Sequence, residues 1–311
     1  MPGNLSVFVI DSDMTNNKPM ISVVMGVYND EKYLRDTINS ILSQTFKDFE
    51  FIIVNDGSTD DTGLILRDYA KKDHRIKVIE QESQGLTKAL IAGCQSAQGE
   101  YIARQDCGDI SRPERLEKQL EHMQSGKSTV LVSCAVNFTG PEGEFLYSLK
   151  EGVGKDFPGI PHHGSALFSA ALYRKVGGYR PEFYFAQDLD LWARLVKHGK
   201  VSFLPEVLYE ARLGENEISG IYRKEQVALT RIIVALRDLD PGGTKYKLLL
   251  HEASLIRPKG KKKVSRFRKA DQMYFLGSCL KSQGNPGYRH YLWECVKNNP
   301  FHIKAWLSLI L

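Results

Sequence analysis

The stretch "ISVVMGVYNDEKYLRDTINSILSQTFKDFEFIIV", residues 21–54, passes from one hydrophobic period to another and back. Its first five residues are mostly β-branched and apolar, which predicts a strand. Apolar side chains then recur at helical spacing at Leu34, Ile38 and Ile41, which predicts an amphipathic helix. The closing run "FEFIIV" returns to a strand pattern. A strand, a helix and a strand in succession indicate a βαβ unit with parallel strands.

The same alternation continues along the chain. It predicts a helix over 62–72, a strand over 76–80, a helix over 86–97 and a strand over 101–104. Strands that alternate with helices of this length are typical of an α/β fold with a doubly wound, mostly parallel sheet. In such sheets ligands bind beyond the carboxyl ends of the strands.

Polar clusters stand at three of these strand ends. They are "GVYND" (26–30), "NDGSTDD" (55–61) and "RQDCGD" (104–109). Each cluster alone reads as an ordinary turn, because Asn, Asp, Gly and Ser are standard turn residues. Together they predict a site for a ligand with hydrogen-bonding edges and phosphates.

Charge and cysteine content bound the cellular setting. The 311 residues include 42 Lys and Arg against 37 Asp and Glu, and "KGKKKVSRFRK" (259–269) concentrates the excess. Such a run suits an anionic surface or is a solvated loop. Five cysteines without a C-x-x-C pair, and no secretory signal, predict a cytoplasmic protein. No apolar run approaches the roughly 18 residues of a membrane span, so membrane contact is expected to be peripheral.

Three regions are expected. Residues 1–18 read as a flexible leader, and residues 19–220 as the α/β domain. Residues 221–311 read as a helical appendage whose hairpins resemble tetratricopeptide repeats, with fewer repeats than an independent solenoid needs.

Three stretches carry a family resemblance: residues 22–62, "GEYIARQDCGD" and "GGYRPEFYFAQDLDLW". In order and spacing they resemble the inverting family 2 glycosyltransferases, which have the GT-A fold, over roughly residues 20–220. The resemblance implies transfer of a sugar from a nucleotide-diphosphate donor, expected to be a UDP-sugar, to an acceptor hydroxyl. The implied setting is the synthesis of cell-surface polysaccharide or glycolipid.

The resemblance also implies donor contacts. Tyr28 matches the residue that stacks on the donor base, and Asp56 the carboxylate that accepts a hydrogen bond from the base. Asp106 matches the aspartate beside the donor ribose, and Lys88 is a candidate for the charge of the diphosphate.

The metal motif is degenerate. The family pattern is Asp-Ala-Asp-Asp, and its second acidic position ligates Mg²⁺ or Mn²⁺. Here Asp106 matches the first aspartate, Gly108 stands at the metal-ligand position and Asp109 follows it. A divalent cation held by Asp106 and Asp109 is therefore expected, with Gly108 in place of the usual ligand.

A second departure lies near residue 212. The family often has Arg-x-His there, whereas Arg212 is followed by Leu213 and Gly214. Three explanations stay open: Asp109 is the ligand, a cation such as Lys88, Arg104 or Arg212 replaces the metal, or catalysis has been lost.

The catalytic base is implied by "AQDLDLW". Asp188 matches the family's general base, and Gln187 stands where the family has Glu. Because Gln187 carries no charge, Asp188 lacks the like-charged neighbour that the family provides, and we expect its pKa to be lower than with that neighbour. The acceptor side is expected to include His163 (of the pair 162–163), Gln187, Trp192 and Arg212.

The leading hypothesis is thus an active glycosyltransferase. Its expected partners are a nucleotide-sugar donor, a glycan or glycolipid acceptor and a membrane surface that residues 259–269 contact, with no nucleic acid. The alternative is a catalytically impaired nucleotide-binding or scaffold protein. A Rossmann dehydrogenase is disfavoured because no G-x-G-x-x-G follows the first strand.

Overall fold

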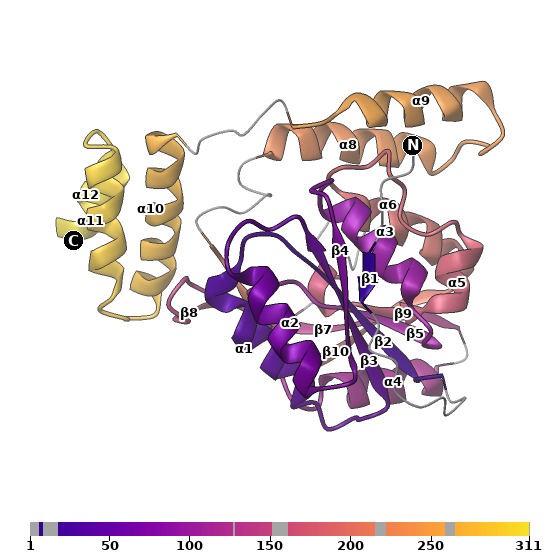
Figure 1. Ribbon diagram of the computed structural model, residues 1–311. Helices are drawn as coiled ribbons and strands as arrows, with labels where there is room; N and C mark the ends of the chain where they lie inside the picture. The colour runs from indigo at the N-terminus through magenta and orange to yellow at the C-terminus, as the bar shows by residue number, and fades with distance from the viewer. Residues whose placement is uncertain are drawn as a thin grey trace. The chain divides into compact units, whose positions relative to one another are not determined.

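A computed structural model describes residues 6–8, 18–126, 128–150, 161–214, 222–258 and 265–310. Its centre is a mixed sheet with the strand order β1-β4-β3-β2-β5-β9-β7-β10-β6. Four neighbouring strands are parallel, as predicted: β4 (Ile76–Gln81), β3 (Phe49–Asp56), β2 (Ile21–Val27) and β5 (Tyr101–Arg104). Figure 1 shows them in the middle of the sheet.

The remaining strands of this order join the sheet through pairings that include antiparallel ones. They are β1 (Ser6–Phe8), β6 (Ile110–Ser111), β7 (Thr129–Thr139), β9 (Leu167–Ser169) and β10 (Lys200–Arg212). β9 is antiparallel to both β5 and β7, and β6 is antiparallel to β10. β1 pairs antiparallel with β4. This strand lies within the expected leader, whose other residues fall outside the described part except for Lys18.

Helices cover both faces of the sheet (Figure 1). The helices of the α/β part are α1 (Glu31–Leu42), α2 (Thr62–Lys72), α3 (Leu86–Ser96), α4 (Arg115–Ser125), α5 (Ala170–Lys175), α6 (Gln187–Leu195), α8 (Arg223–Leu236) and α9 (Thr244–Leu255). Successive side chains of a strand point to opposite faces. Accordingly, Val23 and Met25 of β2 pack in one core cluster, with α1, α2 and α4, while Val24 packs in another with α3 and α6.

Two short 3₁₀ segments matter for the site. His163–Ser165 precedes β9, and Val196–His198 follows α6 directly. The second segment takes Val196 off the apolar face of α6, so Val196 is exposed while Leu195 is buried.

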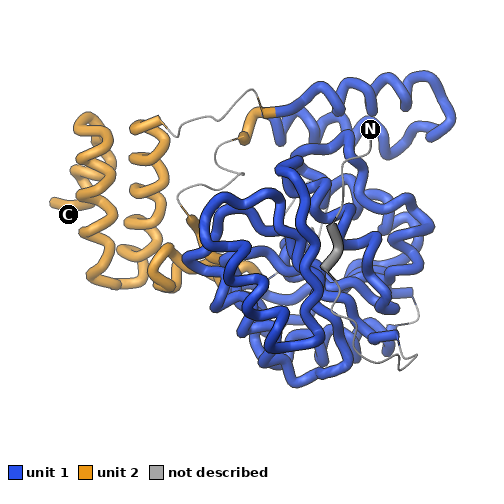
Figure 2. Tube along the Cα trace, in the orientation of Figure 1, with its two compact units in different colours: residues 1–136, 150–210, 225–257 blue, residues 137–149, 211–224, 258–311 orange. Residues whose placement is uncertain are grey.

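The chain divides into two compact units, drawn in separate colours in Figure 2. The first comprises residues 1–136, 150–210 and 225–257, and the second 137–149, 211–224 and 258–311. The second contains β8 (Phe145–Leu149), α10 (Arg266–Ser282), α11 (Tyr288–Asn298) and α12 (Ile303–Ile310). The predicted helical region therefore contributes α8 and α9 to the first unit.

Among the helices in the described part of the chain, none is long and apolar enough to cross a bilayer.

Candidate active site

The three predicted polar clusters follow the parallel strands β2, β3 and β5. Since the carboxyl ends of parallel strands meet at one edge of a sheet, the clusters share that edge. Side-chain hydrogen bonds join the first two: Asn29 Oδ1 accepts from the Thr59 N–H at 2.7 Å, and the Asn29 N–H donates to Ser58 Oγ at 3.0 Å. Tyr28 beside them is 44% exposed, so its side chain is accessible to a ligand.

Asp56 is the buried last residue of β3 and holds the loop before α3. Its Oδ1 accepts from Gln81 Nε2 at 2.6 Å and from the Gln84 N–H at 2.8 Å, and its Oδ2 accepts from the Gly85 N–H at 2.8 Å. A base that bound Asp56 would share these oxygens with the loop. Recognition of the base by Asp56 stays a prediction, and loop ordering is its observed role.

Lys88 projects from the first turn of α3 beside this loop. Its Nζ donates to Gln84 Oε1 at 2.9 Å, and the side chain is exposed. Tyr184, which sequence reasoning missed, packs so closely on Gly85 that a Cβ there would lie 2.6 Å from its ring. The aromatic loop before α6 therefore lies against the loop that Asp56 orders.

The loop after β5 brings Asp106 and Asp109 together through Tyr209 of β10. The Tyr209 hydroxyl accepts from the Asp106 N–H at 3.1 Å and donates to Asp109 Oδ2 at 2.9 Å. Gly108 between them has a φ of +93°, a conformation that suits glycine. Its N–H donates to Thr37 Oγ1 at 3.0 Å.

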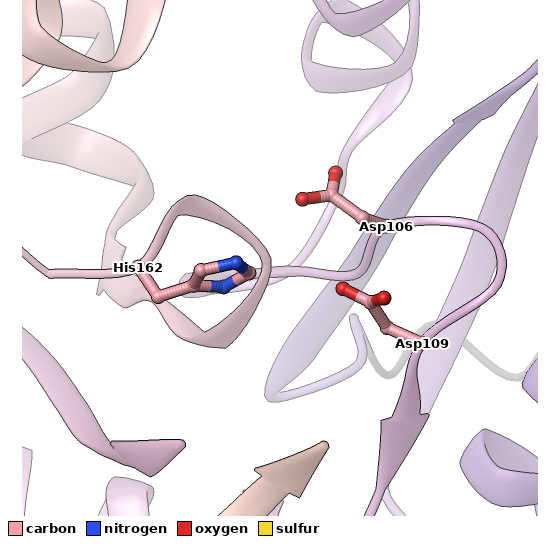
Figure 3. A group of neighbouring side chains, drawn as sticks. All are labelled: Asp106, Asp109 and His162. Carbon is pink, nitrogen blue, oxygen red and sulfur yellow. The ribbon is translucent and has the colours of Figure 1, made fainter. Parts of the chain in front are cut away.

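His162 faces both carboxylates (Figure 3). One ligand atom from each of Asp106, Asp109 and His162 lies within 4.8 Å of the others. Carboxylate oxygens with one imidazole suit Mn²⁺, whereas Mg²⁺ prefers an all-oxygen set. This donor set therefore fits a divalent cation, and it supplies a histidine that the expected set of Asp106 and Asp109 did not contain.

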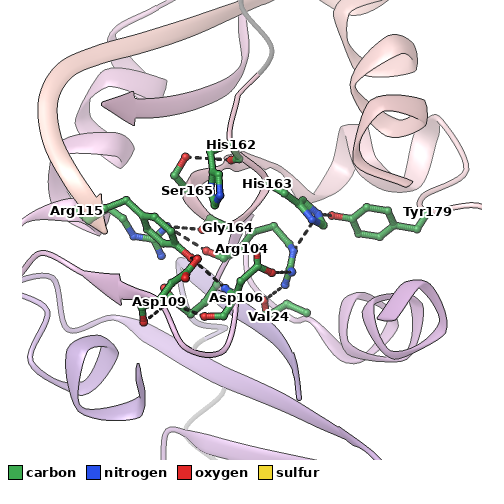
Figure 4. Close-up of polar contacts among 12 residues, drawn as sticks. Val24, Arg104, Asp106, Asp109, Arg115, His162, His163, Gly164, Ser165 and Tyr179 are labelled. Carbon is green, nitrogen blue, oxygen red and sulfur yellow. Dashed lines mark hydrogen bonds and ion pairs between the residues drawn. The ribbon is translucent and has the colours of Figure 1, made fainter. Parts of the chain in front are cut away.

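Arg104 compensates the charge of Asp106 in this buried network (Figure 4). Its Nη2 lies 2.7 Å from Asp106 Oδ1, its Nε donates to His163 Nε2 at 3.2 Å, and it also donates to the Val24 carbonyl. Burial opposes ionisation of Asp106, but the attraction to Arg104, together with smaller contributions from His162, His163 and Arg115, outweighs it and lowers the pKa. Arg104 is thus held by contacts with Asp106, His163 and the Val24 carbonyl.

The two histidines are electrically neutral at physiological pH. Burial lowers the pKa of His162, and burial with repulsion from Arg104 lowers the pKa of His163 to about 3. A neutral imidazole is the form that binds a metal. His163 instead contacts Arg104 and the Tyr179 hydroxyl, which lies 2.7 Å from its Nε2.

Arg115 links the two loops that carry the candidate ligands. Its Nη1 donates to the Arg104 carbonyl at 3.0 Å and to the Gly164 carbonyl at 3.1 Å (Figure 4). Its guanidinium lies 5.3 Å from the centre of the Tyr209 ring. Neither Arg115 nor Tyr209 was predicted, because their roles depend on contacts between distant segments.

Asp188 lies in the first turn of α6. Burial raises the pKa of its carboxyl group, and the negative charge of Asp106 raises it further. The effect of neutral Gln187, relative to a glutamate at that position, stays a prediction.

The expected acceptor-side residues separate in the structure. Trp192 is 2% exposed and packs against Phe168 and His163. It therefore belongs to the core, and the expectation that it contacts an acceptor is corrected. The helical period of α6 turns Trp192 inward. Gln187 is buried at the start of α6, and Arg212 belongs to the second unit.

A separate hollow of about 450 Å³ lies between α1 and α2. Three carboxylates line it beside one arginine, namely Glu31, Asp61 and Asp68 beside Arg35. Such a lining repels a diphosphate, so the edge described above is the better candidate site.

Comparison with known proteins agrees with this geometry. The sequence model that defines glycosyl transferase family 2 matches residues 22–176 of this chain. EpsE of Bacillus subtilis is 37% identical over 207 residues, which cover 63% of this chain and 74% of EpsE. TuaG of the same organism, named for teichuronic acid biosynthesis, is 36% identical over 224 residues, 67% of this chain and 84% of TuaG. Both bear glycosyltransferase names.

Solved structures share the fold at low identity. Residues 1–349 of Staphylococcus aureus TarS, in complex with UDP-GlcNAc, match with a TM-score of 0.57 and 20% identity, over 89% of this chain and 88% of that one. The mannosyltransferase PcManGT from Pyrobaculum calidifontis, in complex with GDP-Man and Mn²⁺, matches with a TM-score of 0.57 and 16% identity, over 94% and 85%. The chain therefore belongs to glycosyl transferase family 2 and is a glycosyltransferase with the GT-A fold.

Proposed function

We propose that this glycosyltransferase moves a sugar from a UDP-sugar to an acceptor hydroxyl with inversion at the anomeric carbon. The observation that carries the proposal is the cluster of Asp106, Asp109 and His162, whose ligand atoms lie within 4.8 Å of one another at the carboxyl edge of the sheet. The solved structures with this fold include complexes with UDP-GlcNAc and with GDP-Man and Mn²⁺, which supports a nucleotide-sugar donor.

Asp106, Asp109 and His162 would hold a divalent cation beside the donor diphosphate. When bound, such a cation supplies positive charge that improves the diphosphate as a leaving group. The chain's own contribution is preorganisation: Tyr209 fixes Asp109, and Arg104 keeps Asp106 ionised. Tyr28 stacks on the base, Asp56 accepts from its edge, and Lys88 stands near the phosphates in this proposal.

Asp188 is the proposed base. Its carboxylate takes the proton of the acceptor hydroxyl while the hydroxyl oxygen bonds to the anomeric carbon. The bond from that carbon to the phosphate oxygen breaks, and UDP leaves with the electron pair. Gln187 directly precedes Asp188 in the sequence, and His163 contacts Arg104 and Tyr179. We assign Gln187 and His163 supporting positions on the acceptor side.

The acceptor is proposed to be a glycan or a glycolipid of the cell surface. The support is the identity to TuaG, whose name refers to teichuronic acid, over 84% of its length. Arg212 is kept as an acceptor-side candidate from the sequence resemblance.

One observation favours a second function, nucleotide binding without turnover. Gly108 occupies the family's metal-ligand position in a left-handed conformation, so no carboxylate can come from that residue. An impaired enzyme of this kind would keep Tyr28 and Asp56 and lose transfer.

Release of UDP from a panel of UDP-sugars, with and without Mn²⁺, tests the proposal. We expect turnover that requires Asp188, with Asp68→Asn as the matched control because Asp68 pairs with Lys72 on the outer helix α2. UDP binding without turnover of any UDP-sugar would favour the second function instead. Turnover with GDP-sugars alone would contradict the donor assignment.

A further inference from the structure

Helix α12 is apolar on two opposite sides. On one side Ala305 is buried and Leu309 packs against the core of the second unit. On the other side Ile303, Leu307 and Ile310 are 72%, 52% and 77% exposed. Their spacing of four and three residues puts them on one face of the helix. Lys304 and Ser308 occupy the remaining side of α12, so the helix has one apolar side packed in the second unit and a second apolar side in solvent.

Aromatic side chains extend this exposed face. The ring of Trp306 lies 5.7 Å from that of Trp293 on α11, edge to face, and both rings are partly exposed. Phe301 is exposed in the turn just before α12. We call these six residues the α12 face: Trp293, Phe301, Ile303, Trp306, Leu307 and Ile310. Of the 16 exposed large hydrophobic side chains in the described part of the chain, eight lie in α10–α12 and the adjoining turn.

Positive charge borders the α12 face. Residues 265–310 contain seven Lys and Arg against two Asp and Glu, a net charge of +5 (7 − 2), which equals that of the whole chain. Lys304 lies on α12 itself, and Lys281 Nζ donates to the Ser308 carbonyl at 2.7 Å. Where α10 begins and α11 ends, Arg266 donates to the Lys297 carbonyl at 3.0 Å.

We propose that the α12 face docks on an anionic lipid bilayer. Tryptophan, phenylalanine and aliphatic side chains on one face, bordered by lysine and arginine, suit the boundary between headgroups and acyl chains. The basic border attracts acidic headgroups. A second copy of the chain fits less well as the occupant, because two faces of the same positive charge would meet. The expected membrane contact of residues 259–269 begins with four lysines in 259–263, which lie outside the described residues.

The test uses the full chain and vesicles, and it reads binding without any transfer activity. The vesicles are pure phosphatidylcholine, or phosphatidylcholine mixed equally with phosphatidylglycerol. We expect co-sedimentation with the mixed vesicles, weakened by added salt because ions screen the basic border. We also expect quenching of tryptophan emission by brominated acyl chains, since Trp293 and Trp306 would enter the bilayer.

The decisive variant is Ile303→Gln with Leu307→Gln, which should bind the mixed vesicles at least about tenfold more weakly, since lost apolar burial weakens interfacial binding. Both side chains point to solvent, so the fold should survive, as a circular dichroism melt will check. Leu64→Gln with Leu248→Gln is the matched control on α2 and α9, where the side chains are 60% and 63% exposed. It should bind like the unaltered chain.

Three results would overturn the proposal. The first is failure of the unaltered chain to bind mixed vesicles. The second is equal binding by the Ile303→Gln, Leu307→Gln variant. The third is a stable dimer in solution that this variant alone disrupts, because it would assign the α12 face to a second copy of the chain.

Discussion

The two halves of the candidate site are built in different ways. The half around Asp56 comes from β2, β3 and the loop before α3. Asp56 accepts there from Gln84 and Gly85, which are only 28 and 29 residues away in the sequence. The half around Asp106 joins segments far apart in sequence, since Asp106 and its partner Tyr209 are separated by 103 residues. The first half is a local product of the fold, and the second depends on the whole sheet being assembled. The predictions below test whether the halves act separately.

The largest effect is expected from Asp188→Asn. Loss of the base should lower kcat by about 10²–10⁴-fold, with UDP affinity unchanged, whereas Asp68→Asn should keep both. Steady-state kinetics and UDP titrations measure the two quantities. A variant that keeps full kcat would remove Asp188 from the mechanism.

The pH profile of the unaltered chain checks the same residue. Because burial raises the pKa of Asp188, its basic form is lost at a higher pH than for an ordinary aspartate. The rate should therefore fall, as pH decreases, through an apparent pKa above the usual aspartate range, and Asp188→Asn should lack that limb. An acid limb that is unchanged in the variant belongs to another group.

The next largest effect concerns Asp106 and stability. Asp106→Asn leaves the fully buried Arg104 without its ionic partner, and we expect a loss of about 3 kcal/mol in the free energy of unfolding. Asp109→Asn weakens the hydrogen bond from Tyr209 and keeps the ion pair of Arg104 with Asp106, so we expect a cost of about 1–2 kcal/mol. Urea unfolding at neutral pH compares them. Equal costs would mean that the Arg104 pair does not hold this half together.

That stability has a definite pH dependence. The pKa of Asp106 is lower in the folded chain than in the unfolded one, because attraction to Arg104 and to smaller positive contributions around it exceeds the cost of burial. Its contribution is therefore complete above the unfolded pKa and is lost as pH falls through the folded one. The Asp106→Asn variant should show a correspondingly flatter loss of stability in acid.

Asp56→Ala should weaken UDP binding by roughly tenfold, about 1.4 kcal/mol, because the loop that it orders loses three acceptor contacts. If the halves are independent, Mn²⁺ should increase UDP affinity by the same factor in this variant and in the unaltered chain. Calorimetry with and without Mn²⁺ gives both factors. A lost Mn²⁺ effect would show that the halves are coupled.

The smallest effect is expected at Gly108. Gly108→Ala should lower the free energy of unfolding by about 1–2 kcal/mol because of its positive φ. Gly143→Ala is the matched control, since Gly143 has a φ of +87° and no atom within 4 Å of a Cβ.

Gly108→Asp adds a second cost to that strain. A Cβ at Gly108 lies 3.6 Å from Asp30 Oδ2, so a new carboxylate meets a negative charge. It should be less stable than Gly108→Ala in the same urea titration, and it should not raise Mn²⁺ affinity. Raised affinity would show that the family's ligand position is still usable.

The sequence predicts the elements that position Tyr28 and Asp56. Strand and helix periods between residues 21 and 104 identify β2, α1, β3, α2, β4, α3 and β5 within a few residues. The edge of a parallel sheet then gathers the polar clusters without further information. The order of these strands and helices is therefore enough to predict that Tyr28 and Asp56 lie at the same edge of the sheet.

The second half could not be read in the same way. Nothing in the pair His162–His163 says which ring faces Asp106, and the buried contacts of Arg115 and Tyr209 form only when β9 and β10 join the sheet. The resemblance predicts Trp192 on the acceptor side, whereas its position on α6 turns it into the core. Packing between segments far apart in the sequence determines where these side chains lie, and a local sequence pattern does not predict such packing.

The most direct test of the account is calorimetric titration of the purified chain with UDP in Mn²⁺ and again in EDTA, with GDP in parallel and His162→Ala as the variant. The account predicts that Mn²⁺ strengthens UDP binding roughly tenfold or more, at least about 1.4 kcal/mol, and that His162→Ala loses most of this gain. Equal affinity in Mn²⁺ and EDTA would contradict the cation site formed by Asp106, Asp109 and His162. Absence of binding to either nucleotide would contradict the donor site as a whole.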